Sequence, residues 1–406
     1  MPMTRYPKIF LKPGKDAAVR RFHPWIFSGA IGRVEGSPAD GDTVAIFSAN
    51  GEPLATGHFS PGSIAVKIVD FKTADAGPEF WKAKLKSACK ARERIGYLGG
   101  VAPHACRLVN SEGDMMPGII IDWYNGVVVI QAHSRGMYNL LPVFTEALQE
   151  EFGDRLTAVY YKNPDSRPPV HSSACPPVHP LTRSPDKFLF GSSDPVEITE
   201  TGHKFIVDFI HGQKTGFFLD QRGNRMFAQF YARGKKVLNA FCYSGAFSVY
   251  ALKGGAGHVH SVDSSKQAIE WTDRHIALNG YDPSCHTSEV ADVKRLLAET
   301  SERYDMIILD PPAFAKTHQV SNNALHAYVH INAEAIRRLN AGGNLFTFSC
   351  SQPVSREMFR SAVQSAAIEA GRQVKILHHL SQGPDHPVSV FHPEGEYLKG
   401  LVLEVQ

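Results

Sequence analysis

The sequence lacks any apolar run that approaches the about 18 residues needed to cross a membrane. Its first residues, MPMTRYPKIFLKPGK, lack the apolar centre of a secretory signal. Six cysteines are scattered over 406 residues, and no two form a Cys-x-x-Cys pair. We therefore expect a cytoplasmic protein with reduced thiols, without a disulfide framework, a membrane partner or a zinc site.

A large excess of charge of either sign is also missing. The chain has 43 Lys and Arg against 40 Asp and Glu, a net charge of +3. This value is too small to indicate a nucleic-acid partner, so the local distribution of charge must decide. The 19 histidines include no His-Glu-x-x-His motif, and no metal is expected. The length predicts two or three domains with ample core.

The stretch from residue 235 to residue 263 carries the clearest pattern. Val237 and Leu238 begin a buried strand, a tight turn FCYSG follows, and residues 246–252 repeat at helical spacing. A second apolar run, 259–262, ends at Asp263. Strand, turn, helix, strand and acid begin a doubly wound α/β sheet. Asp263 can accept hydrogen bonds from two ribose hydroxyls, which predicts a nucleoside-containing cofactor.

The turn itself bears on which cofactor binds. A dinucleotide fold requires Gly-x-Gly-x-x-Gly, and this turn has only Gly245. Little bare backbone is left for a pyrophosphate. S-adenosylmethionine has no phosphate and suits a looser turn with nearby carboxylates, so we favour it over NAD.

The later strands also end in polar residues. Asp292 follows a strand near 285–288, where it would contact the adenine amine, cap the helix 293–297, or do both. The strand 304–309 ends in Asp310-Pro311-Pro312, whose prolines cannot extend a central strand. A helix over 325–339 ends in a turn at 341–343, and the strand 344–349 leads into Cys350. Residues 374–377 and 397–404 are predicted to close the sheet as an antiparallel pair.

Residues 1–72 predict a small β domain with strands at 43–47, 54–59 and 64–69. The segments GKDAAVRRFHPWIFSGAI, GDTVAIF and GEPLATGHFSPGSIAVKIV resemble a PUA domain, a small RNA-binding β-barrel. Basic residues gather here, and Lys12, Arg20 and Arg21 are the expected RNA contacts. The alternative is a solvated surface without a partner.

A middle α+β domain is expected over 73–192. It would contain helices at 79–96 and 140–152, strands at 107–109, 118–122, 127–131 and 158–161, and a connector rich in proline and serine at 163–185. A hairpin of residues 196–198 and 204–207 would lead into a third domain, 193–406.

The segment HGQKTGFFLDQR, residues 211–222, is dense in polar and aromatic residues, and a helix over 224–231 follows it. Asp220 could meet the amino group of the cofactor, and Arg222 its carboxylate or an RNA phosphate. The alternative places Asp220 as a helix cap. Lys214 is a further expected RNA contact.

Together, GQKTGFFLDQR, VLNAFCYSGAFS, SVDSS, ILDPPAF, FTFSCS and the tail DHPVSVFHPEGEYLKG resemble the PUA-bearing 23S ribosomal RNA cytosine-5 methyltransferase family over nearly the whole chain. The resemblance implies a PUA domain, a middle domain and a Rossmann-like class I methyltransferase domain with a mostly parallel seven-stranded sheet. It implies methylation of 23S ribosomal RNA, naked or partly assembled into the large subunit. The implied cofactor-pocket residues are Asn239, Phe241, Ser244, Gly245, Asp263, its neighbour Ser264, Asp292 and Asp310. Oligomeric state stays open, a homodimer included.

The resemblance also implies that Cys350 is the nucleophile. Carbon 5 of cytosine is electron-poor, and a thiolate that adds at carbon 6 makes it able to attack a sulfonium methyl. Asp310 would hold the edge of the base. The alternative for Cys350 is a buried, inert cysteine, the commoner fate of a lone one.

One departure limits the comparison. Several RNA cytosine-5 families carry a second cysteine directly after the motif prolines, and Ala313 stands there instead. The sequence thus names no group that removes the carbon 5 proton, and a lysine contact to RNA at this position is also absent. Two rivals remain: a base N-methyltransferase, since Asp-Pro-Pro followed by Phe314 resembles enzymes that methylate exocyclic amines, and a non-catalytic RNA-binding assembly factor.

Overall fold

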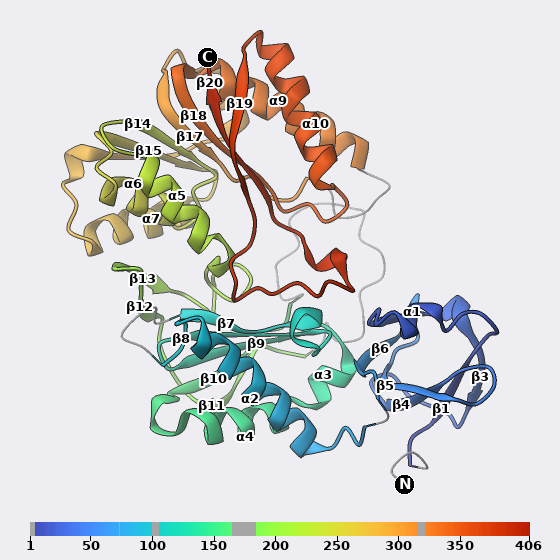
Figure 1. Cartoon of the computed structure of the whole chain (residues 1–406). Helices are drawn as coiled ribbons and strands as arrows, with labels where there is room; N and C mark the ends of the chain where they lie inside the picture. The colour runs from blue at the N-terminus through green and yellow to red at the C-terminus, as the bar shows by residue number, and fades with distance from the viewer. Residues whose placement is uncertain (1–4, 73, 100–104, 165–183, 315–320) are drawn as a thin grey trace. The chain divides into compact units, whose positions relative to one another are not determined.

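The computed structural model describes the chain except for residues 1–4, 73, 100–104, 165–183 and 315–320, the grey trace in Figure 1. The described residues fall into two compact units. The first comprises residues 1–199, 206–219 and 384–395, and the second comprises residues 200–205, 220–383 and 396–406. Neither unit is therefore one continuous stretch of sequence.

The first unit begins with a six-stranded sheet in the order β2-β6-β5-β4-β1-β3. Its strands are β1 (Lys8–Leu11), β2 (Trp25–Phe27), β3 (Ile31–Glu35), β4 (Thr43–Phe47), β5 (Pro53–Phe59) and β6 (Ile64–Asp70), with the short helix α1 (Ala17–Arg20). The predicted strands are confirmed as β4, β5 and β6. β3 was not predicted because four of its five residues are exposed, so it lacks an apolar pattern.

A five-stranded sheet, ordered β11-β10-β9-β8-β7, forms the rest of this unit's scaffold. Its strands are β7 (Ala105–Asn110), β8 (Ile119–Tyr124), β9 (Val127–Ala132), β10 (Ala158–Tyr161) and β11 (Lys187–Gly191). The helices α2 (Pro78–Arg94) and α4 (Leu141–Phe152) bury Trp81, Leu85 and Phe144 in its core, and α3 (Arg135–Asn139) precedes α4. The predicted helices and strands are confirmed here, and β11 is an addition. Most of the predicted connector, residues 165–183, lies outside the described residues.

The second unit is built on a seven-stranded sheet in the order β16-β15-β14-β17-β18-β20-β19. The pairs from β16 to β18 are parallel, and β20 is antiparallel to both β18 and β19. The strands are β14 (Lys236–Ala240), β15 (His258–Asp263), β16 (His286–Val290), β17 (Tyr304–Leu309), β18 (Leu339–Ser349), β19 (Val374–Leu380) and β20 (Lys399–Val405). This is the doubly wound, mostly parallel sheet that the sequence predicts.

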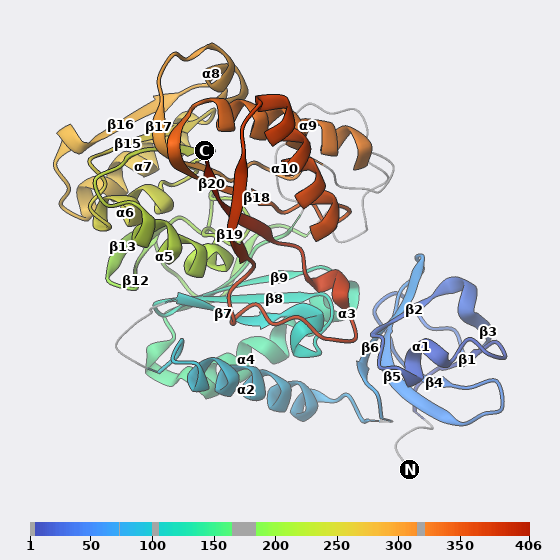
Figure 2. The same ribbon diagram turned by 45° about the horizontal axis from the view of Figure 1, so that its top comes forward.

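Helices cover both faces of that sheet (Figure 2). They are α5 (Arg222–Tyr231), α6 (Ala246–Lys253), α7 (Lys266–Leu278), α8 (Val293–Glu299), α9 (Ser321–Arg337) and α10 (Arg356–Ala370). The central strands contribute Leu238, Ile307 and Leu345 to a core shared with α8, α9 and α10. A separate hairpin, β12 (Val196–Glu200) and β13 (His203–Val207), appears where it was predicted.

Two local predictions are wrong. Residues 341–343 do not form a turn that ends α9, because β18 already begins at Leu339 and pairs with Tyr304 before a bulge. Asp220 does not cap a helix: Gln221 occupies the N-cap of α5, without a side-chain cap bond. Among the described helices, none is long and apolar enough to cross a membrane.

Candidate functional site

The carboxyl ends of the parallel strands gather the predicted site residues along one edge of the second unit's sheet. Phe241 follows β14, Asp263 ends β15, and Asp310 follows β17. Asp292 comes two residues after β16, and Cys350 comes directly after β18. Since parallel strands end at the same edge, the fold brings these five residues to one side of the sheet.

The turn after β14 has unusual backbone geometry. Phe241 and Tyr243 have positive φ angles of 60° and 48°. Residues other than glycine rarely adopt this left-handed backbone conformation. Gly245 has φ 71°, and a Cβ there would lie 2.5 Å from Thr272 Cγ2, so α7 approaches the backbone closely. Such strain gathers at ligand sites. Ser244, predicted to line the pocket, is 7% exposed.

Asn239 lies inside the sheet rather than on its edge. It is 1% exposed, and its amide donates to Ser248 Oγ over 2.8 Å. Ser248 Oγ in turn contacts Ser261 Oγ on the neighbouring strand. Asn239 therefore connects β14, α6 and β15 through these hydrogen bonds.

Asp263 is held by two backbone groups. Its carboxylate oxygens accept hydrogen bonds from the amides of Tyr243 at 3.0 Å and Ser265 at 2.9 Å. Each oxygen has capacity for a second bond, so the carboxylate can still accept hydroxyl donors. Ser264, beside it, is exposed.

Asp292 performs the capping role that the sequence predicts. Its Oδ1 accepts from the Arg295 amide over 2.9 Å at the N-terminus of α8. The second carboxylate oxygen leaves it able to meet a ligand as well.

Asp310 and Cys350 come from neighbouring strands, β17 and β18. Asp310 Oδ2 accepts from Gln221 Nε2 over 2.9 Å. The Cys350 sulfur lies 4.0 Å from the carbonyl oxygen of Pro311, the residue after Asp310, and Cys350 is partly exposed. The predicted catalytic pair is thus brought together, and the sulfur is not sealed under packed side chains.

Cys242 is a second thiol in this region, and it is unsuited to nucleophilic chemistry. It is 6% exposed, and burial raises the pKa of its thiol to about 12.

Asp220 and Arg222 take up contacts that the sequence did not predict. Asp220 Oδ2 accepts from the Tyr397 hydroxyl over 2.6 Å. Arg222 is 2% exposed, and its Nε donates to Glu200 Oε2 over 2.9 Å. Glu200 also binds Arg225, so the Arg222 guanidinium belongs to a buried ion network and lends no support to its predicted contact with a cofactor carboxylate or an RNA phosphate.

Gln221, Tyr397 and Glu200 were therefore missed as neighbours of the site. Gln221 adjoins Asp220 in a segment already marked as polar, which was a usable signal. Glu200 and Tyr397 lie far away in sequence, and no local pattern connects them to Arg222 and Asp220.

The residues predicted to contact RNA differ in the contacts that their side chains make within the protein. Arg20 forms ion pairs with Asp16 and Glu52, which offset its charge. Lys12 Nζ donates to the Gly29 carbonyl over 3.0 Å, and Arg21 is exposed. Lys214, at φ 50°, lies 5.0 Å from the ring centre of Phe218.

A search of the described residues finds no group of three or more His, Cys, Asp and Glu side chains that could hold a metal ion.

Comparison with known proteins gives two family matches. Residues 9–71 match the PUA-like domain, and residues 178–389 match the S-adenosylmethionine-dependent methyltransferase family. "Ribosomal RNA large subunit methyltransferase I" of Shewanella denitrificans is 38% identical over 98% of this chain and 99% of its own length. The protein of the same name from Tolumonas auensis is 39% identical over 97% and 98%.

Solved structures agree on the fold. A candidate SAM-dependent methyltransferase from Streptococcus mutans superposes with a TM-score of 0.82 at 21% identity, over 98% of this chain and 99% of that one. A further candidate methyltransferase, solved as a complex with SAH, gives 0.83 at 22% identity over the same shares. At these identities the likeness establishes the shared fold.

Proposed function

This chain belongs to the S-adenosylmethionine-dependent methyltransferase family, together with the ribosomal RNA large subunit methyltransferases I, and from that premise we propose its reaction. It methylates carbon 5 of a cytosine in 23S ribosomal RNA, in the cytoplasm, through a covalent adduct with Cys350. The observation that carries this proposal is the position of the Cys350 sulfur, 4.0 Å from the Pro311 carbonyl and beside Asp310, at the edge where the cofactor-family residues gather.

The residues at the strand ends fit the cofactor. Bound S-adenosylmethionine would supply a methyl group on a positively charged sulfur. Asp263 has acceptor capacity left for the ribose hydroxyls, and Asp292 for the adenine amine. The turn after β14 offers a strained backbone with a single glycine, which suits a cofactor without a pyrophosphate.

Cys350 begins the reaction by attacking the cytosine ring. Its thiolate forms a bond to carbon 6, and the electrons of the 5,6 double bond make carbon 5 nucleophilic. Carbon 5 would then take the methyl group as the sulfur–methyl bond of the cofactor breaks and its electrons stay on sulfur, and a proton acceptor would remove the proton from carbon 5. The electrons of that C–H bond then restore the double bond, and the thiolate leaves carbon 6.

Asp310 holds the cytosine ring in place during these steps. Its carboxylate, oriented by Gln221, can accept a hydrogen bond from the exocyclic amine of cytosine. Uracil lacks this donor, so Asp310 would also favour cytosine over uracil.

RNA is proposed to contact the PUA-like domain through phosphates and to place the target base, swung out of its stack, at this edge. Lys12 and Arg21 are better placed for that role than Arg20, whose charge is already paired.

The decisive experiment replaces the sulfur. Ribosomal RNA from cells that lack this chain is mapped by mass spectrometry after complementation with wild type, Cys350→Ser or the control Cys285→Ser. Cys285 is a partly exposed cysteine that precedes β16, at the amino end of a strand whose carboxyl end lies on the edge of Asp310 and Cys350. We expect wild type and Cys285→Ser to restore one methylcytosine, and Cys350→Ser to restore none.

Three results contradict the proposal. A methyl group restored on a purine identifies a base N-methyltransferase that acts through the Asp-Pro-Pro segment. Full methylation by Cys350→Ser excludes the covalent adduct. Absence of methylation by wild type, with no S-adenosylmethionine binding in calorimetry, instead favours a non-catalytic assembly factor.

A further inference from the structure

Lys399 is a buried lysine directly beside the turn that carries Cys350. It is the first residue of β20, pairs in register with Ser349 at the end of β18, and is 3% exposed. Its Nζ donates to the carbonyl oxygen of Ser351 over 2.7 Å. The amine therefore spans the Ser349–Ser351 turn from the neighbouring strand.

The opposite side of the same turn is held by α9. The Tyr328 hydroxyl, which is fully buried, contacts Ser351 Oγ over 2.9 Å. Lys399 thus holds the backbone carbonyl of Ser351 and Tyr328 holds its side-chain hydroxyl, so the residue after Cys350 is fixed at two points. A fixed backbone is what a positioned nucleophile needs.

The charge of Lys399 has no carboxylate partner. Among the described residues, no acid lies within 4.0 Å of Nζ, and Glu396, the nearby acid before β20, is paired with Arg356. A buried, unpaired ammonium is costly, and burial lowers the pKa of Lys399 to about 8. The charged groups that act on it are Cys350, Arg356 and Glu396.

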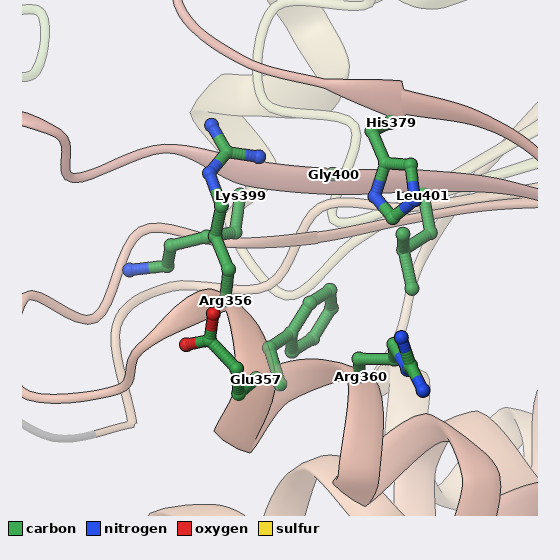
Figure 3. Close-up of a pocket in the computed structure, with 8 residues that line it drawn as sticks. Arg356, Glu357, Arg360, His379, Lys399, Gly400 and Leu401 are labelled. Carbon is green, nitrogen blue, oxygen red and sulfur yellow. The ribbon is translucent and has the colours of Figure 1, made fainter.

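A shared anion site does not account for this lysine. Arg356, Arg360, His379 and Lys399 line a hollow of about 180 Å³ between α10 and the last strands. In Figure 3, however, the Lys399 amine extends away from Arg360 and His379. The basic groups therefore do not converge on one ligand. The Lys399 ammonium instead interacts with the segment that carries Cys350.

We propose that Lys399 is a positioning residue for Cys350: it holds the Ser351 carbonyl and supplies the positive charge that favours the thiolate. This inference rests on the proposed function, in which Cys350 is the nucleophile. The positive charge stabilises the anion of the sulfur, and the hydrogen bond keeps the sulfur at the strand edge.

The test measures the reactivity of the sulfur rather than methylation. Full-length wild type, Lys399→Gln, Lys399→Arg and the control Lys375→Gln are treated with iodoacetamide from pH 6 to pH 10. Alkylation of Cys350 is followed by peptide mass spectrometry, with Cys285 in the same molecules as the internal reference. Lys375, on β19, is an exposed lysine paired with Glu404.

The glutamine variant separates charge from hydrogen bonding, because its amide can still donate to Ser351 while its charge is gone. We expect Lys399→Gln to slow Cys350 alkylation at pH 7 by about tenfold and to move its pH profile upward by roughly one unit. Lys399→Arg and Lys375→Gln should retain the wild-type profile, and the Cys285 profile should not change in any variant.

An unchanged Cys350 profile in Lys399→Gln overturns the inference, as does an equal change in Lys375→Gln. If Lys399→Gln fails to fold, by melting temperature, Lys399→Arg decides: a wild-type profile supports the inference, and a profile shifted upward contradicts it. The rate of Cys350 alkylation can be measured whether or not the protein methylates RNA. Methylation that survives Cys350→Ser removes the proposed function while the effect of Lys399 on the sulfur can still be measured.

Discussion

Glu200 shows how much of the second unit depends on one carboxylate. Arg222 Nε and Arg225 Nε each donate to it over 2.9 Å, and the Tyr250 hydroxyl donates over the same distance. Glu200 is fully buried, and both guanidinium groups are 2% exposed or less. Although burial alone would raise the pKa of Glu200, the two arginines hold it below its usual value.

The Glu200→Gln protein should therefore unfold more easily than wild type. The change removes the carboxylate charge that pairs with two buried guanidinium groups, and breaking a buried pair in this way costs about 3–5 kcal/mol. Urea denaturation followed by circular dichroism measures the loss as a lower midpoint. Glu299→Gln, which breaks an exposed pair with Arg295, should leave the midpoint nearly unchanged, and an equal drop in both variants would contradict the argument.

For single residues, the sequence predicted the positions of the acidic side chains better than the contacts of the basic ones. Asp263 and Asp310 could be located because each comes at the end of an apolar run, and Asp292 because it precedes the predicted helix 293–297; strand ends of a parallel sheet share one edge. Arg222 could not be assigned, because its partner Glu200 lies 22 positions away in another element. The role of a charged side chain depends on a partner that local sequence does not name.

Between elements, the packing of β5 against α2 and α3 places a histidine where no water reaches. His58 is 4% exposed and lies with its ring centre 5.3 Å from that of Trp81 on α2. A Cβ on Gly136 of α3 would come within 2.4 Å of the His58 ring, so the contact tolerates no larger residue. Its Nδ1 has no hydrogen-bond partner among the described residues.

This packing predicts a loss of stability in mild acid. Burial, and then the charge of Lys67, lower the pKa of His58 to about 4, against about 6.5 in the unfolded chain. Between these two pH values, His58 is protonated in the unfolded chain but stays neutral in the folded protein. The contribution of His58 to the free energy of unfolding should thus fall by about 3 kcal/mol as the pH drops from above 6.5 to about 4.

Urea unfolding at several pH values, followed by tryptophan fluorescence, measures this slope. His58→Phe keeps a ring beside Trp81 and should reduce the slope by the His58 share, while other histidines, such as the buried His286, whose pKa burial also lowers to about 4, keep the remainder. The control His379→Phe, at an exposed position on β19, should leave it as in wild type. A slope unchanged in His58→Phe would show that other groups cause the acid sensitivity.

The elements themselves were largely predictable, because the apolar periodicity of α2, β8, β14 and β17 follows the burial that the structure gives them. The failures have physical reasons. β3 is mostly exposed. The glycines at 342 and 343 indicated a turn, whereas they lie within the bulge of β18, between the residues that pair with Tyr304 and Met306. A pattern of burial predicts only those elements that bury a face.

Over the whole molecule, the first compact unit includes two short segments, 206–219 and 384–395, that come from the second half of the sequence. The predicted domain limits near residues 72 and 192 stay a prediction. Both segments were recognised as motifs of the methyltransferase resemblance. Their packing partners could not be read from the sequence, since those partners lie more than forty positions away.

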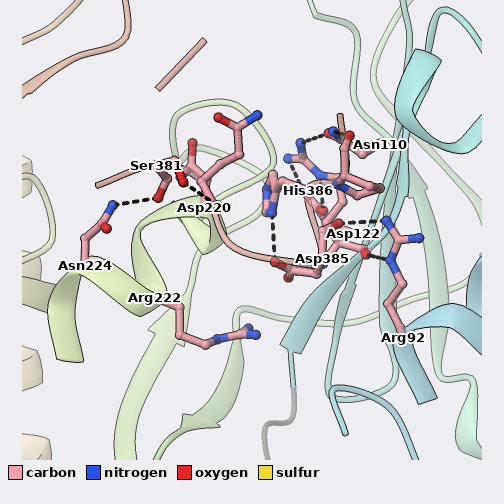
Figure 4. Close-up of polar contacts among 12 residues, drawn as sticks. Arg92, Asn110, Asp122, Asp220, Arg222, Asn224, Ser381, Asp385 and His386 are labelled. Atoms are coloured by element: carbon pink, nitrogen blue, oxygen red, sulfur yellow. Dashed lines mark hydrogen bonds and ion pairs between the residues drawn. The ribbon is translucent and has the colours of Figure 1, made fainter. Parts of the chain in front are cut away.

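Those segments are tightly bound within the first unit. Thr215 Oγ1 donates to the buried Asp122 carboxylate over 2.6 Å, and Lys162 Nζ donates to the Phe209 carbonyl over 2.7 Å. Arg92 donates to the Asp385 carbonyl over 2.7 Å, and His386 pairs with the Asp385 carboxylate over 2.9 Å (Figure 4). Phe209 and Asp385 are fully buried there.

A fragment of residues 193–406 should therefore fail to protect these two segments, although it contains the complete seven-stranded sheet. Without the first unit, Phe209 loses its cover and Asp385 loses the guanidinium that binds its carbonyl, so the backbone of both segments opens to water. Limited proteolysis of the fragment and of the full chain, with cleavage sites identified by mass spectrometry, makes the comparison. We expect cuts within 206–219 and 384–395 in the fragment alone, while β14 to β18 stay intact in both. Equal protection of the segments in the fragment would mean that the second half of the chain orders them by itself, and would support the predicted boundary at residue 193.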